Sequence, residues 1–236
     1  MASMPALIAA LQPFDGRDPT TLNNIGRTLR PDFVVTSKRG GGAADMDFRS
    51  AANVILAFYG ADSAKDAPAA VEIFRALTGG LTPHAESLDV LTEIRAAQDF
   101  GSALETLIDG IPEIVVSSWR YINEANFGGD PQVHFERMMR GDGPVWLEVT
   151  LSRYGAAIEL CETAASGSKK SVFFIRYYAM PDLQRLAYKL GLRTGADKHV
   201  TVRFGLPMLT TAWGVVTDNT FLHNPDTFID AWESSR

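Results

Sequence analysis

Apolar side chains in the first half of the chain recur every three or four residues, the spacing of amphipathic helices. Leu7, Leu11 and Phe14 predict a short first helix that ends before Gly16, and Asp18-Pro19 is typical of the start of a second. Asp47 is placed to cap a third helix, and Asp66 a fourth. The predicted helices span residues 7–14, 19–33, 47–59, 66–78 and 86–109.

The pattern changes near residue 113, where apolar and polar side chains begin to alternate. Residues 114–119 fit either a strand or a helix. Residues 145–152 and 157–162 alternate on both sides of a short turn and predict a β-hairpin. Further predicted elements are helices at 130–139, 182–190 and 206–216, a loop at 164–170, and strands at 171–178 and 200–204.

These elements predict an α+β protein with two domains. The first, residues 1–112, is helical. The second, residues 113–236, is a small mixed β-sheet with short helices. A change of pattern near one position is typical of a domain boundary.

The composition of the 236 residues is that of a folded globular protein, with 46% hydrophobic and 21% charged residues. No apolar run is long enough for a membrane helix, and the first residues lack the positive charge of a signal peptide. The single cysteine, Cys161, excludes an internal disulfide and a cysteine-based zinc site. We therefore expect a cytoplasmic protein without a membrane partner.

The net charge of −6 is unevenly distributed along the chain. Residues 46–112 hold ten acidic and four basic side chains, whereas residues 151–205 hold nine basic and four acidic ones. A protein that coats nucleic acid through its whole surface is basic overall, so this balance leaves only a local basic face.

A glycine-rich loop between two predicted helices is the clearest sequence signal for a ligand. It runs from Thr36 to Met46 and contains Lys38, Arg39, Gly40, Gly41 and Gly42. Glycines let backbone N–H groups approach another molecule, and cations beside a helix start favour an anion. The loop lacks the spacing of a Walker A or a dinucleotide-binding motif. It is either a solvated connector or a segment that contacts a nucleic-acid backbone.

The helices predicted at 47–59 and 66–78 can be interpreted as a helix-turn-helix pair. Their connection is longer than the usual three or four residues, and the second helix offers only Lys65 and Arg75 as cations. With these and the loop, the candidate nucleic-acid-binding residues are Lys38, Arg39, Gly40, Gly41, Gly42, Arg49, Lys65 and Arg75.

The basic C-terminal region also carries aromatic residues on its predicted strands. Such strands can form a stacking surface for single-stranded nucleic acid, or the rings can face the core while the cations are solvated. The pairs Phe173-Phe174 and Tyr177-Tyr178 place one ring on each face of a strand, so alternation leaves both interpretations open.

Catalytic and metal-binding patterns are sparse. The four histidines are scattered without an i, i+4 pair, no Gly-x-Ser-x-Gly motif occurs, and Cys161 fits a small core residue. We expect no enzyme activity, no metal and no cofactor.

Three segments resemble a group of uncharacterised proteins from prophages and mobile elements of alphaproteobacteria. They are Lys38 to Met46, Ser50 to Ala57 and Gly60 to Ala67, and the similarity covers roughly residues 17–80, with a looser match at Val200 to Pro207. The group has no established activity. The resemblance implies a phage-type context, in which small cytosolic proteins bind DNA as regulators or packaging factors.

The sequence therefore favours a DNA-binding protein, a regulator or a packaging or accessory factor. The alternative is a protein–protein interaction or assembly factor, for example a host-inhibitory phage protein, that acts through the acidic helices of residues 46–112. Two-fold dimers are common among regulators, so a homodimer stays open.

Overall fold

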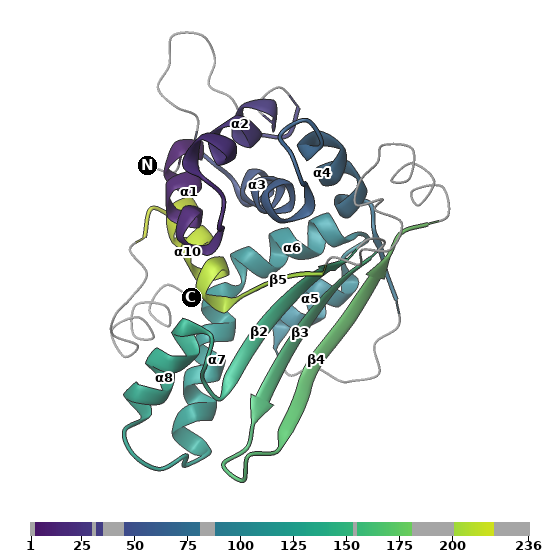
Figure 1. Ribbon diagram of the computed structural model, residues 1–236. Coiled ribbons are helices and arrows are strands. Elements are labelled where there is room, and N and C mark those ends of the chain that lie inside the picture. The colour runs from purple at the N-terminus through teal and green to yellow at the C-terminus, as the bar shows by residue number, and fades with distance from the viewer. Residues whose placement is uncertain are drawn as a thin grey trace.

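The computed structural model describes residues 3–29, 32–34, 45–80, 88–152, 155–180 and 201–219. Within these ranges the chain has the predicted α+β class: a helical N-terminal part is followed by the main strands of an antiparallel sheet and a last helix (Figure 1). The helices are α1 (Met4–Leu11), the 3₁₀ turn η1 (Gln12–Phe14), α2 (Pro19–Leu29), α3 (Phe48–Gly60), α4 (Ala67–Arg75), α5 (Asp89–Ala96), α6 (Phe100–Asp109), α7 (Ile111–Glu124), α8 (Pro131–Arg140) and α10 (Leu206–Val216).

Aspartate side chains begin several of these helices by accepting backbone hydrogen bonds. Asp47 accepts from the N–H of Ser50 at 2.7 Å, which confirms the predicted cap of α3. Asp99 accepts from the N–H of Ser102 at 2.7 Å and starts α6. The single helix predicted over 86–109 is therefore wrong, because the capped start of α6 follows the end of α5 at Ala96.

Residues 114–119, which fitted a strand or a helix, belong to helix α7. Ile111, Ile114, Val115, Ser118 and Ile122 are all buried and recur at the spacing of one helix face. Pro112 lies in the first turn, where proline costs no hydrogen bond.

Five strands form one sheet in the order β1-β4-β3-β2-β5, and all their pairings are antiparallel where the sequence predicted a mixed sheet. The strands are β1 (Thr78–Gly79), β2 (Val145–Ser152), β3 (Gly155–Thr163), β4 (Lys169–Tyr178) and β5 (Val202–Gly205). The predicted hairpin is confirmed as β2 and β3, with Ser152 opposite Gly155.

Two sequence predictions near the sheet are wrong, and a third concerns residues outside the described ranges. Thr78 and Gly79, expected to end α4, form a short strand beside the end of β4. Lys169 and Lys170, expected in a loop, begin β4 and pair with Thr163 and Glu162. The helix predicted at 182–190 lies outside the described residues.

One face of the sheet is covered by helices. Along β2 every second residue is buried, and Phe173, Ile175 and Tyr177 are the buried residues of β4. The ring of Tyr177 contacts that of Phe100 in α6, and its hydroxyl donates to the carbonyl of Ile94 in α5 at 3.2 Å. Figure 1 shows α5 and α6 behind the strands. We call this helix-covered side the inner face.

A β-bulge interrupts the pairing of β3 and β4. Leu160 lies opposite Phe173, whereas its neighbour Cys161 lies opposite Ser171. Val172 is therefore the extra residue of β4. Strands β3 and β4 form a second hairpin, connected through residues 164–168, and between the bulge and this connection the β4 residues that face each side of the sheet are shifted by one position.

The buried side chains of the helices and the sheet form one connected cluster. Helix α10, from the C-terminal part of the chain, packs against α1, α3 and α6 of the N-terminal part. Helix α7 begins at the predicted boundary near residue 112. The division into two domains stays a prediction.

The buried hydroxyl of Tyr177 gives a test of this packing. Replacing Tyr177 by Phe removes the hydrogen bond to Ile94, and we expect the free energy of unfolding in urea to fall by about 1 kcal/mol. Tyr178→Phe is the matched control, because Tyr178 is 53% exposed, and it should change stability by less than about 0.5 kcal/mol. Equal losses in the two variants would contradict the assignment of Tyr177 to the inner face.

Candidate functional site

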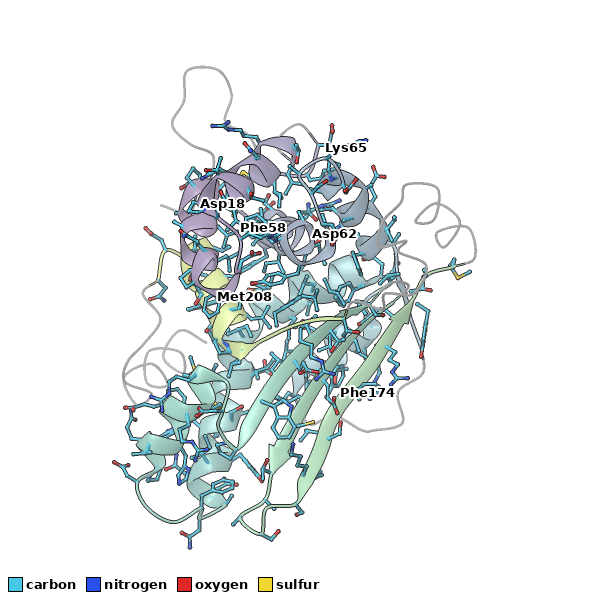
Figure 2. All side chains as sticks on the ribbon, in the orientation of Figure 1. Asp18, Phe58, Asp62, Lys65, Phe174 and Met208 are labelled. Carbon is cyan, nitrogen blue, oxygen red and sulfur yellow. The ribbon has the colours of Figure 1, made fainter. Side chains whose placement is uncertain are left out.

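The glycine loop and its two cations lie outside the part of the chain that the structure describes. Lys38, Arg39 and Gly40–Gly42 therefore stay sequence predictions. Of the other candidates, Arg49 is exposed in the first turn of α3, and Lys65 is exposed in the connection between α3 and α4 (Figure 2).

The third candidate cation, Arg75, is held inside the helical packing. Its guanidinium donates to the side-chain oxygen of Asn53 in α3 at 2.9 Å and forms an ion pair with Glu105 in α6. A Cβ atom at Gly101 would lie 2.8 Å from the Arg75 guanidinium carbon, so this glycine leaves room for the side chain. Arg75 links three helices and is not placed to contact a phosphate backbone.

The helix pair α3 and α4 does not present a recognition surface. Every residue of α3 from Ser50 to Gly60 is buried, because α2, α4, α6 and α10 surround it. Helix α4 exposes Glu72, and Pro68, Ala69 and Arg75 are half-buried. A recognition helix needs exposed donors to bases and phosphates, and α4 supplies none.

The sheet face opposite the helices gathers polar, charged and aromatic side chains. We call it the open face. Its members alternate with the buried residues of the inner face and are Trp146, Glu148, Thr150 and Ser152 of β2, Ala157, Glu159 and Cys161 of β3, Lys169, Ser171, Phe174, Arg176 and Tyr178 of β4, and Arg203 of β5. Four strands thus bring side chains from residues 146 to 203 together.

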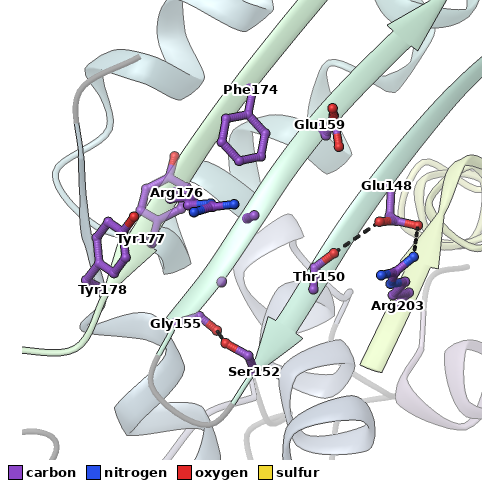
Figure 3. A pocket seen from close by; sticks show the side chains of 12 residues that line it. Glu148, Thr150, Ser152, Gly155, Glu159, Phe174, Arg176, Tyr177, Tyr178 and Arg203 are labelled. Carbon is purple, nitrogen blue, oxygen red and sulfur yellow. Dashed lines mark hydrogen bonds and ion pairs between the residues drawn. The ribbon is translucent and has the colours of Figure 1, made fainter. Parts of the chain in front are cut away.

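A shallow hollow of about 540 Å³ lies over the half of the open face next to the turn between β2 and β3 (Figure 3). Glu148 and Glu159 are directly opposite each other on β2 and β3, and Arg176 and Arg203 lie on the strands to either side. Phe174 and Tyr178 line the hollow from β4. The carboxylates therefore lie on the two central strands at one end of the hollow, and the cations and aromatic rings lie on the strands that flank them.

The charged side chains of the open face contact neighbouring side chains on the same face. Arg203 forms an ion pair with Glu148 at 3.6 Å, and the Thr150 hydroxyl donates to the same carboxylate at 3.2 Å. Arg176 lies over the ring of Phe174, with 5.0 Å from the guanidinium carbon to the ring centroid. Lys169 lies over the ring of Trp146 at 4.8 Å. Both contacts are cation–π interactions.

Cys161 is buried at the edge of this face, and its thiol donates to Glu159 at 3.2 Å. Burial, reinforced by the neighbouring carboxylate, raises the pKa of Cys161 from an ordinary 9.0 to about 12. Folding therefore suppresses the thiolate between pH 9 and 12, and this thiol lowers the stability of the fold as the pH rises through that window. A buried neutral thiol is a poor nucleophile.

A second hollow, of about 270 Å³, adjoins the first. Glu148 and Arg203 line both. The remaining lining of the second hollow comes from the end of α8, from β2 and β5, and from the start of α10: Met138, Gly141, Trp146, Leu147, Phe204, Gly205, Leu206 and Pro207. It is more apolar than the first hollow and has one carboxylate and one guanidinium at its rim.

Metal-binding and membrane-spanning features are not found in the described ranges. No group of three or more His, Cys, Asp or Glu side chains there could hold a metal ion. None of the helices described is long and apolar enough to cross a membrane.

The sequence did not identify the open face as a site. The alternation of β2 and β3 was evident, but the assignment of Phe174, Arg176 and Tyr178 to the same side as Glu148 depends on the strand register. The signal that was available, basic residues next to aromatic ones in β4, allowed either face.

Comparison with known proteins adds no relative to this description. No protein-family model matches the chain, no curated protein matches it, and no solved structure matches it.

The internal position of Arg75 predicts an effect on stability. Arg75→Ala removes hydrogen bonds to Asn53 and Glu105, so the free energy of unfolding should fall by about 2 kcal/mol in urea titration. Lys65→Ala, which truncates an exposed cation nearby in the sequence, should change it by less than about 0.5 kcal/mol. A variant Arg75→Ala as stable as the parent protein would refute the structural role.

The raised pKa of Cys161 predicts slow chemical modification of the folded protein. At pH 8 a thiol-reactive disulfide reagent should label Cys161 rapidly in urea and slowly without it. Glu159→Gln removes the carboxylate that helps to raise the pKa, and it should speed the labelling of the folded protein. Rapid labelling of the folded parent protein would show that the thiol is accessible and ionised.

Proposed function

We propose that this chain is a non-enzymatic nucleic-acid-binding protein and that it binds a single strand on the open face of its sheet. The observation that supports this most directly is the strand register, which gathers aromatic rings and cations from three strands, β2, β4 and β5, on a face that the described helices leave uncovered. We retain the prophage or mobile-element context and the cytoplasmic setting as parts of the proposal.

Strand β4 supplies the residues that suit the backbone and the bases. Lys169 and Arg176 place positive charge along it, and Phe174 and Tyr178 offer rings on the same side. Phe174 and Tyr178 are four residues apart, about 13 Å along the strand, so they would contact different bases. Base–aromatic stacking together with cations that follow the backbone is the common mode of single-strand binding.

The carboxylates at the centre of the face favour a single strand over a duplex. Glu148 and Glu159 repel phosphates, which directs the backbone toward β4 and leaves the bases over β3 and β2. A carboxylate can accept hydrogen bonds from base N–H groups, and these are available only when the base is unpaired. A duplex would present two phosphate backbones to a face whose middle is acidic.

The alternative, a protein-interaction factor acting through residues 46–112, has less support in the described residues. Exposed acidic side chains occur there, but they lie on separate elements: Asp47 at the start of α3, Asp62 before α4, Glu72 in α4, Asp89 and Glu93 in α5, and Asp109 at the end of α6. Glu105 in the same region is paired with Arg75. The glycine loop stays a predicted additional contact for DNA.

Truncating the exposed ring or cation of β4 should weaken binding to a labelled oligothymidine. Tyr178→Ala removes a stacking platform and should lower affinity by about five- to a hundredfold in fluorescence anisotropy. Arg176→Ala should weaken binding and reduce the slope of log affinity against log salt by about 1. Arg27→Ala, an exposed cation of α2, is the matched charge control and should bind like the parent protein.

The same assay separates this proposal from the helical hypothesis. If Arg49→Ala and Lys65→Ala weaken binding while Tyr178→Ala and Arg176→Ala do not, then the contact surface lies on the helices. Absence of binding to any single strand at low salt would refute the proposal itself.

A further inference from the structure

The second hollow differs from the first in both size and chemistry. At about 270 Å³ it is too small for a typical drug-sized ligand, and its walls are largely apolar. Trp146 forms part of the wall, and the only charged groups of the lining are Glu148 and Arg203. Such a site suits one flat ring system that carries hydrogen-bonding groups along a single edge.

The two charged groups at its rim are held loosely. The Arg203 guanidinium lies 3.6 Å from the Glu148 carboxylate, and the Thr150 hydroxyl lies 3.2 Å from its other oxygen. The Arg203 side chain is 66% exposed, whereas that of Glu148 is 29% exposed. A ligand edge can therefore replace the Arg203 contact without breaking a tightly bonded pair, and the less exposed Glu148 contributes more to discrimination.

The pair presents an acceptor beside a donor, which a nucleobase edge can complement. Guanine has two adjacent N–H donors, at N1 and N2, next to the O6 acceptor. The donors match the two oxygens of one carboxylate, and O6 matches a guanidinium. Adenine and thymine offer a carboxylate one donor with an acceptor beside it. Cytosine also offers the carboxylate one donor. Its two acceptors could bond only to Arg203, which is the more exposed of the two charged groups and therefore discriminates less.

We propose that the second hollow binds one guanine base of the single strand, with Glu148 accepting from N1–H and N2–H, Arg203 donating to O6, and Trp146 against the ring. This inference rests on the proposed function, because it takes the strand to lie on the open face. Strands β2 and β5, which line the hollow, are two and three strand spacings from β4, about 10 and 14 Å, so the nucleotide that reaches the hollow crosses the open face from β4.

The test uses thymidine oligonucleotides of about twelve residues in which one central position is guanine, adenine, cytosine or hypoxanthine. In anisotropy titrations at fixed salt, the guanine strand should bind the parent protein between about fivefold and a hundredfold more tightly than the adenine strand. Hypoxanthine keeps N1–H and O6 but lacks the N2 amino group, so its strand should fall between the two.

Two matched carboxylate variants locate the preference. Glu148→Gln should reduce the ratio of guanine to adenine affinity to about twofold or less, because an amide offers one acceptor instead of two. Glu159→Gln makes the same charge change one strand away, at a residue that lines only the larger hollow, and should keep the ratio. Comparing ratios removes the general gain in phosphate affinity that the loss of a negative charge brings.

The outcomes distinguish the two levels of the proposal. Equal affinity for all four strands, or a preference for cytosine as large as that for guanine, would overturn the guanine site and leave single-strand binding in place. Loss of the ratio in Glu159→Gln instead of Glu148→Gln would overturn the assignment to the second hollow. Failure of every strand to bind at low salt would refute the proposed function instead.

Discussion

The burial of one sheet face against the helices constrains most of this structure. Side chains alternate along a strand, so packing Leu147 and Val149 inward forces Glu148 and Thr150 outward. The same constraint acts on β4, where Ile175 and Tyr177 are buried and Arg176 and Tyr178 are exposed. The composition of the open face is therefore a consequence of the packing of the inner face.

The helical part meets a different constraint, because its central helix is surrounded. Helix α3 is rich in alanine and ends in Gly60, where a Cβ atom would lie 2.9 Å from the ring of Phe74 in α4. Close packing on all sides leaves its polar residues inside, and Asn53 is bonded there to Arg75 and to the carbonyl of Phe33. From Ser50 to Gly60 this helix supports the fold, and only its first turn, with Arg49, reaches the surface.

Local signals in the sequence predicted much of the fold. The caps at Asp18 and Asp47, the hairpin of β2 and β3, and helix α10 follow from short-range spacing and appear as predicted. The break between α5 and α6 was missed, because the helical spacing of apolar residues continues across it. The chain leaves the helix after Ala96, and Asp99 caps the start of a new one. The open face was beyond local reasoning, since it requires the register of strands more than fifty residues apart, such as β2 and β5.

The extra residue Val172 divides β4 into two parts, and the residues that face outward are even-numbered in one part and odd-numbered in the other. On the side of the bulge nearer β1, the even-numbered residues of β4 face outward; on the side nearer the connection between β3 and β4, the odd-numbered Lys169 and Ser171 do. Lys169 reaches Trp146 only because of this change of phase. A shift of alternation confined to the hairpin tip can thus exchange which of its side chains meet solvent, while Phe173 and Tyr177 keep their contacts with the core.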